Sequence, residues 1–215
     1  MPKMSPDRAL GNRVGTTADG KGALGNGGDG VAVTAGFDNL IGDGTPSGSN
    51  TIAFNGDDGV EVFSISSTGN EISRNSIFSN VGLGIDLVGQ GESPSTNVFT
   101  PNDPGDADEG PNNLQNKPVL SSAKTVSAKT TIAGKLDSIP NQPYTIEFFS
   151  NPQDTNEGKK LIGEKSITTS ADGLRTFTFS PATSVAVGQE ITATAFSTAT
   201  GDTSEFSAPK RVASS

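Results

Sequence analysis

The side chains that could do chemistry in this 215-residue sequence are mainly carboxylates, because it contains no His, Cys or Trp. Without His or Cys there is no Ser-His-Asp or Cys-His nucleophile, and there is no imidazole or thiolate ligand for zinc. No disulfide can form. Catalysis or ligand binding must therefore depend on Asp, Glu, Lys, Arg, hydroxyl groups or a hard metal ion.

The most concentrated group of carboxylates lies in a Pro-, Gly- and Asn-rich stretch near the middle of the chain. It consists of Asp103, Asp106, Asp108 and Glu109, which fall within seven residues. Several oxygen ligands on a loop that can wrap around an ion are what Ca²⁺ requires. The spacing is not that of an EF-hand, and a solvated acidic linker whose Asp and Asn side chains cap turns has the same composition. Both interpretations stay open, with Ca²⁺ as the one cofactor that the sequence suggests.

A second set of carboxylates in the first half consists of Asp29, Asp57, Asp58, Glu61 and Asp86. If segments 25 residues apart stack, Glu61 and Asp86 lie on one outward face of neighbouring coils, close enough to raise a pKa. Paired carboxylates can serve as acid and base in the cleavage of polysaccharides. However, nearby cations are few, and no Tyr or Trp precedes residue 117. We therefore expect outward, solubilising acids and no catalytic residue.

An internal repeat predicts the elements that carry these acids. Residues 50–62 align with residues 75–87 at an offset of 25, and an earlier copy, residues 26–33, lies 29 residues before its counterpart. Each copy contains strands too short to bury a face of their own, so equivalent strands of successive coils are expected to pair in parallel. Gly and Asn suit the corners, because Gly adopts positive φ without cost and Asn tolerates it and can ladder with the Asn of the next coil.

The composition changes near residue 116. Residues 1–116 contain 21 of the 27 Gly, 15 acidic and 5 basic side chains, whereas residues 117–215 contain 9 acidic and 10 basic ones. In the later part, apolar residues alternate with polar ones in about seven segments separated by turn signals. The predicted inward faces are Ile132/Gly134/Leu136, Tyr144/Ile146/Phe148, Phe177/Phe179 and Ile191/Ala193/Ala195.

These observations predict an all-β chain with two domains. We expect a parallel β-helix of about three to four coils over residues 1–99, with residues 1–10 as a tag or cap. An acidic junction is expected over residues 100–116, and an immunoglobulin-like β-sandwich over residues 117–215.

Particular segments resemble a known family. Residues 11–31, followed by Asn39–Gly42, resemble the coil consensus of the bacterial right-handed parallel β-helix repeat proteins, and the likeness covers roughly residues 11–88. Residues 102–119, 144–151 and 203–207 are similar to the segment that ends such helices and to the β-sandwich that follows. The resemblance implies a large secreted or cell-surface chain, in a family that includes adhesins, structural stalks and carbohydrate-active enzymes.

We therefore expect a non-enzymatic extracellular or cell-surface module with a structural or adhesive function. The alternative is a fragment of a carbohydrate-active enzyme, a lyase or hydrolase, or a polysaccharide-binding module. Met1–Leu10 has no apolar segment typical of a secretion signal.

The expected partners are a polysaccharide or a cell-surface protein. The net charge of −9 argues against nucleic acid and anionic membrane, and no apolar run is long enough for membrane insertion. Self-association is expected at the N-terminal coil, because an unpaired parallel edge invites strand addition.

Overall fold

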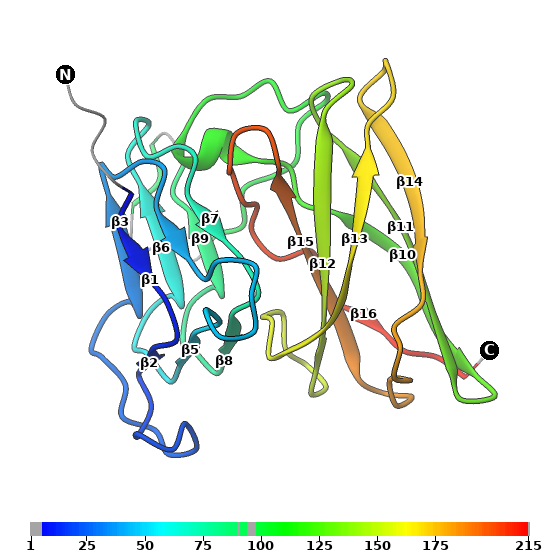
Figure 1. The fold of residues 1–215 in the computed structure, drawn as a ribbon, viewed down its shortest axis with the longest axis horizontal. Coiled ribbons are helices and arrows are strands. Elements are labelled where there is room, and N and C mark those ends of the chain that lie inside the picture. Colours follow the sequence, from blue (N-terminus) through cyan, green and yellow to red (C-terminus); the bar gives the residue numbers. More distant parts are fainter. Residues whose placement is uncertain (1–5, 90, 94–97, 215) are drawn as a thin grey trace.

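The computed structural model describes residues 6–89, 91–93 and 98–214, and its strands form two groups that lie side by side (Figure 1). Strands β1 to β9 make three small parallel sheets, and strands β10 to β16 make two antiparallel sheets. One short 3₁₀ helix, η1 (Pro111–Leu114), lies between the two groups in the described part of the sequence. The chain is all-β, as predicted.

Each parallel sheet takes one strand from each of three successive repeats. The sheets are β1-β4-β7 (Arg8–Ala9, Leu40–Ile41, Glu71–Ile72), β2-β5-β8 (Arg13–Val14, Thr51–Ala53, Ser76–Phe78) and β3-β6-β9 (Val31–Thr34, Val60–Phe63, Ile85–Leu87). The predicted register is confirmed, because Val31 is opposite Val60 and Val60 is opposite Ile85. Parallel sheets stacked in this way are compatible with a β-helix. Arg8 and Ala9 are part of the first coil, and residues 1–5 of the predicted tag or cap lie outside the described residues.

Inward side chains of the parallel strands form one narrow apolar core. Ile52, Val60 and Ile77 are almost completely buried in it. At the last coil the core continues into Phe149 and Phe206 of the second half, whose rings meet edge to face with centroids 5.4 Å apart. Because this core is only one coil wide, a chain with 31% hydrophobic residues can fill it.

Asparagine side chains stack from coil to coil at the corners, as predicted. Asn50 Oδ1 accepts hydrogen bonds from the backbone N–H (2.9 Å) and the side-chain amide (3.2 Å) of Asn12. Asn75 Oδ1 accepts the equivalent pair from Asn50, at 3.0 and 2.8 Å. Further ladders join Asn39 to Asn70, and Asn26 to Asn55 to Asn80. Each ladder satisfies backbone amides that the short strands leave unpaired.

The expected conformation of these asparagines is wrong in one respect. At most of these positions the residue before the Asn, and not the Asn, adopts positive φ, with 66° at Gly11, 63° at Phe54 and 71° at Gly69. Each of these residues turns the chain so that the following Asn side chain points along the stack. Glycine suits this position because it has no Cβ.

The second half contains two antiparallel sheets. They are β10-β11-β14 (Val119–Val126, Lys129–Asp137, Leu174–Phe179) and β13-β12-β15-β16 (Lys160–Thr168, Pro143–Asn151, Glu190–Ser197, Lys210–Arg211). Apolar residues of both sheets share one buried cluster, to which Leu136, Ile146 and Ile191 belong, so the predicted inward faces are confirmed. Between the sheets, the ring of Phe148 stacks on that of Phe179 with centroids 4.3 Å apart.

We predict that Asn50→Ala destabilises the chain, because it breaks the ladder between Asn12 and Asn75 and leaves buried polar groups unpaired. The expected loss in the free energy of unfolding is about 2 kcal/mol or more, measured by urea denaturation with circular dichroism. Asn26→Ala is the control, because Asn26 is the exposed end of its ladder and should cost less than about 1 kcal/mol. Equal losses in the two variants would show that the ladder does not stabilise the coils.

Candidate functional site

The structure brings together three of the four acids predicted to bind calcium in the junction. Asp103, Asp106 and Asp108 each place a carboxylate oxygen within 4.8 Å of the others. Glu109 does not belong to this group, because it is exposed and lines a separate hollow with Phe63. A position next to Asp108 in the sequence is therefore not sufficient for Glu109 to reach the cluster.

Within this cluster, Asp106 already has strong hydrogen-bond partners. Its Oδ1 accepts from the backbone N–H of Asn116 (2.7 Å), and its Oδ2 accepts from Gln115 Nε2 (2.7 Å) and Ser138 Oγ (2.5 Å). Burial raises the pKa of Asp106 to about 6, although these hydrogen bonds oppose the rise. Asp106 thus fastens the junction to Ser138, directly after β11. A bound cation would have to share the Asp106 carboxylate with these donors, and the calcium site at the junction stays a prediction.

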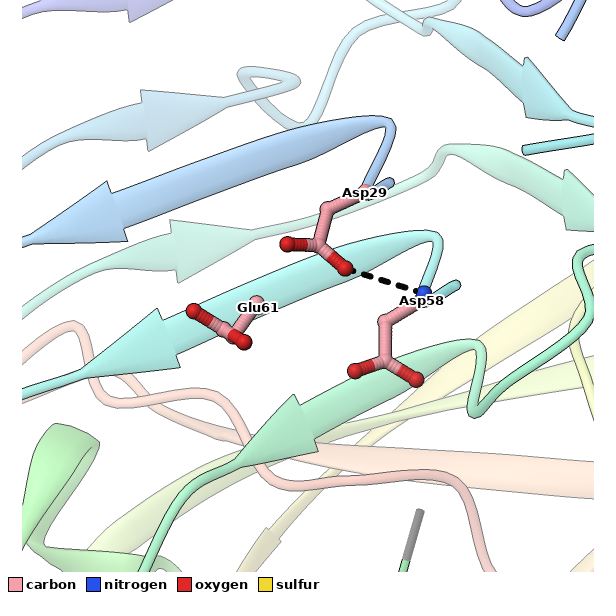
Figure 2. Close-up of side chains that lie close together, drawn as sticks. All are labelled: Asp29, Asp58 and Glu61. Carbon is pink, nitrogen blue, oxygen red and sulfur yellow. Dashed lines mark hydrogen bonds between the residues drawn. The ribbon is translucent and has the colours of Figure 1, made fainter. Parts of the chain in front are cut away.

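The second set of acids lies on sheet β3-β6-β9 and at the corner before it (Figure 2). Asp29 and Asp58 occupy equivalent corner positions in the first two coils, where Asp29 Oδ1 accepts the backbone N–H of Asp58 at 3.0 Å. Asp58 Oδ1 in turn accepts the backbone N–H of Leu83 at 2.5 Å. Because the third coil has Leu83 at this position, the ladder of acids ends there.

Glu61 and Asp86 are opposite each other on β6 and β9, as predicted, with Ala32 at the same position on β3. The expectation that they are solubilising surface acids is wrong, because only 7% of Glu61 and 2% of Asp86 is exposed. Helix η1 contacts β6 and β9, and Asp86 lies near the charges of Glu205 and Glu92, so later segments of the chain approach these strands.

Burial and mutual repulsion make these acids weak. Burial, and next the charge of Asp29, raise the pKa of Glu61 to about 7. Burial and the neighbouring Asp58 raise the pKa of Asp86 to about 8, and the Asp58 and Asp86 side chains share a hydrogen bond. Two carboxyl groups can share a hydrogen bond only when one of them holds a proton. The Asp86–Asp58 pair therefore behaves as one carboxylic acid and one carboxylate near neutral pH.

The sequence did not predict how the second half closes the last coil. Six backbone N–H groups along the edge of this coil donate to side chains from beyond it. The pairs are Gly69 N with Asp202 Oδ1 (2.6 Å), Asn70 N with Asn112 Oδ1 (3.0 Å), Ile72 N with Thr203 Oγ1 (2.9 Å), Arg74 N with Glu147 Oε2 (2.9 Å), Asn80 N with Glu157 Oε1 (3.2 Å) and Leu87 N with Glu205 Oε1 (3.4 Å). In a longer stack these donors would face another coil, so the second half ends the stack.

The carboxylates that close the coil are themselves buried. Burial raises the pKa values of Glu157 and Glu205, and it raises that of Glu147 to about 7. Lys117 Nζ lies 2.9 Å from Glu205 Oε2 and partly offsets the effect of burial there. One sequence signal points to this face. Phe149 directly follows the inward Phe148 and lies on the same side of β12 as Glu147, so β12 is apolar on both sides near its end.

No protein-family model matches the chain, and no curated protein matches it either. The resemblance to β-helix repeat proteins therefore stays a prediction. Within the described residues, no helix has the length and apolar character needed to span a membrane.

We predict that the chain loses stability as the pH rises from about 4.5 to 7. The folded state holds the Glu147 proton more tightly than the unfolded chain, because burial and the charges of Glu164 and Glu71 outweigh Arg74 and its backbone N–H. Protons bound only in the folded state favour folding, and they are released as the pH passes through the raised pKa. The shift corresponds to about 3 kcal/mol of unfolding free energy from this one group.

The measurement is the urea midpoint of unfolding at pH 5 and pH 8. Glu147→Gln keeps an oxygen acceptor for the Arg74 N–H but cannot ionise, so its midpoint should change less with pH. Glu109→Gln, at an exposed position, is the matched control and should behave like the unchanged chain. A Glu147→Gln profile as steep as that of the control would contradict the prediction.

Proposed function

We propose that the chain is a non-enzymatic structural or adhesion module of an extracellular or cell-surface protein. In this proposal, the parallel half is the last part of a right-handed β-helix and the antiparallel half is an immunoglobulin-like β-sandwich that ends it. The observation that carries the proposal is the row of six side chains that accept the N–H groups of the last coil. Such a cap supports a role in which the second half finishes and holds a stalk.

The strand order supports the immunoglobulin-like assignment. Seven strands divide into a three-stranded sheet, β10-β11-β14, and a four-stranded sheet, β13-β12-β15-β16. Immunoglobulin-like sandwiches divide seven strands between two sheets in a comparable way. The proposal also keeps Ca²⁺ at the junction, where Asp108 Oδ1 is buried without a hydrogen-bond partner among the described residues.

The opposite end of the parallel half supports a role in self-association. β1, β2 and β3 are the outer strands of their sheets, and a hollow of about 320 Å³ lined by Ala9, Val31 and Ile41 lies beside them. Unpaired strand edges with exposed apolar groups favour pairing with another chain. The proposed occupant of this edge is a second copy of the same chain.

We predict that light scattering coupled to size-exclusion chromatography gives a mass that rises towards a dimer with concentration. Val31→Lys places a charge at the open end of the core and should keep the chain monomeric. Val126→Lys, at an exposed position of β10, is the matched control and should still associate. A monomer at every concentration would contradict the proposed self-association.

A second candidate function is the cleavage of acidic polysaccharides. It is favoured by the paired positions of Glu61 and Asp86 and by their pKa values of about 7 and about 8, which suit an acid–base pair near neutral pH. Two observations favour the structural role: both side chains are buried, and no Lys or Arg among the described residues forms an ion pair with either.

A reducing-end assay on uronic-acid polymers, run beside a glycan array, tests the two functions. We expect no turnover, and binding without turnover would support adhesion. Turnover that is lost in Glu61→Gln or Asp86→Asn would overturn the structural proposal in favour of catalysis. Asp19→Asn, on an exposed loop, controls for a general effect of removing charge.

A further inference from the structure

The carboxylate of Glu61 occupies an unusual environment. Only 7% of Glu61 is exposed. Among the described residues, no hydrogen bond or ion pair reaches its carboxylate. Figure 2 shows Glu61 on the middle of β6, with Asp29 and Asp58 at the two corners beside it, and one oxygen of its carboxylate lies within 4.8 Å of an oxygen of each. A buried carboxylate without a donor or a cation is costly, and the usual remedies are a proton or a metal ion.

The distances within this group allow one divalent cation to contact all three side chains. One carboxylate oxygen from each of Asp29, Asp58 and Glu61 lies within 4.8 Å of the others. Each Ca–O distance is about 2.3–2.6 Å, so two ligands of one Ca²⁺ are at most about 4.6–5.2 Å apart. Ca²⁺ accepts carboxylate ligands in flexible geometry, whereas Mg²⁺ demands near-ideal octahedral geometry.

The fold holds the three side chains in place without the ion. The hydrogen bond between Asp58 N and Asp29 Oδ1 fixes the two corners relative to each other, and Leu83 N holds Asp58 from the other side. Glu61 lies on the strand that begins two residues after Asp58, so its backbone is fixed by pairing with Ala32 and Asp86. Asp29 is only half-buried, which leaves a route from solvent.

The charges around the group favour a cation. Asp57 lies next to the group, and its charge raises the pKa of both Glu61 and Asp58 further. No Lys or Arg forms an ion pair with Asp29 or Glu61 in the described part of the chain.

We infer that Asp29, Asp58 and Glu61 form a divalent-cation site that binds Ca²⁺ across the first two coils, with water completing the coordination shell. The site is separate from the calcium proposed at the junction, and it does not depend on an adhesive or structural function. Bound Ca²⁺ would join two successive coils at their outer corner and remove the repulsion between stacked acids.

The test is isothermal titration of CaCl₂ into the full chain after treatment with EDTA and buffer exchange, together with thermal unfolding in EDTA and in Ca²⁺. We expect binding with a dissociation constant of roughly 10⁻⁴ to 10⁻³ M and a higher melting temperature in Ca²⁺. Glu61→Gln and Asp29→Asn each remove one charged ligand and should weaken binding at least about ten-fold. MgCl₂ should bind more weakly than CaCl₂.

Two controls keep the result specific. The Asp103→Asn/Asp108→Asn variant alters the junction and should keep the Ca²⁺ affinity of this site. Glu61→Gln should melt in EDTA at least as high as the unchanged chain, because it removes a buried charge, so loss of binding cannot be attributed to unfolding. Asp29→Asn keeps the oxygen that accepts Asp58 N and provides an independent variant.

The inference is overturned if the unchanged chain gives neither heat nor a melting shift at millimolar Ca²⁺, or if Glu61→Gln and Asp29→Asn bind as tightly as the unchanged chain. Binding that disappears only in the junction variant would assign the ion to Asp103 and Asp108 instead. None of these outcomes depends on glycan binding or on self-association, so the site can fail while the proposed function stands.

Discussion

The backbone edge of the last coil is the constraint on which the rest of the structure depends. Every coil donates N–H groups to its successor, so a stack of coils always ends in a row of donors without partners. A buried N–H group without an acceptor costs about 1–3 kcal/mol, and an exposed row invites pairing with other chains. Here Glu147, Glu157 and Glu205 supply acceptors at three sides of the coil. The two halves are therefore joined by directed hydrogen bonds as well as by the packing of Phe149 and Phe206.

Carboxylates are strong acceptors, but burying them costs desolvation free energy, which appears as raised pKa values.

Carboxylates on the outer face of β3-β6-β9 are also costly, because the repeat stacks them on one another. A repeat places equivalent side chains about 4.8 Å apart, so an acid that recurs from coil to coil lies directly over its own copy. Two such pairs occur, Asp29 with Asp58 and Glu61 with Asp86. The repulsion within each pair is offset only by donated N–H groups, a shared proton or a cation. Ala32 and Leu83 interrupt the two columns of acids, which limits each column to two members.

The sequence predicted what the local pattern determines. Offsets of 25 and 29 residues gave the correct register of Val31, Val60 and Ile85, and period-two alternation identified the inward face of β12.

The contact between Glu147 and Arg74 was not predictable in the same way. These residues are 73 positions apart, and alternation alone does not distinguish an outer sheet face that packs on the parallel sheets from one that faces water. For the same reason Glu61 and Asp86 were expected at the surface, since the repeat pattern does not show which later segments approach their strands. Three junction acids were correctly grouped because they are close in sequence, whereas Glu109 leaves the group at the turn into η1.

The difference between the two ends of the parallel half is the strongest argument about function. Cleavage of a polymer requires an acid pair that the polymer can reach, and only 7% of Glu61 and 2% of Asp86 is exposed. A structural role makes no such demand on the acids. It requires one end that accepts further strands and one end that does not. β1, β2 and β3 have a strand partner on one side only within the described residues. At the other end, side chains of Thr203 and Glu205 meet β7 and β9, and the backbone of Gly158 pairs with Ile77 of β8. Under the proposed function, further strands would add only at the edge of β1, β2 and β3, which is the property that a terminal module of a stalk needs.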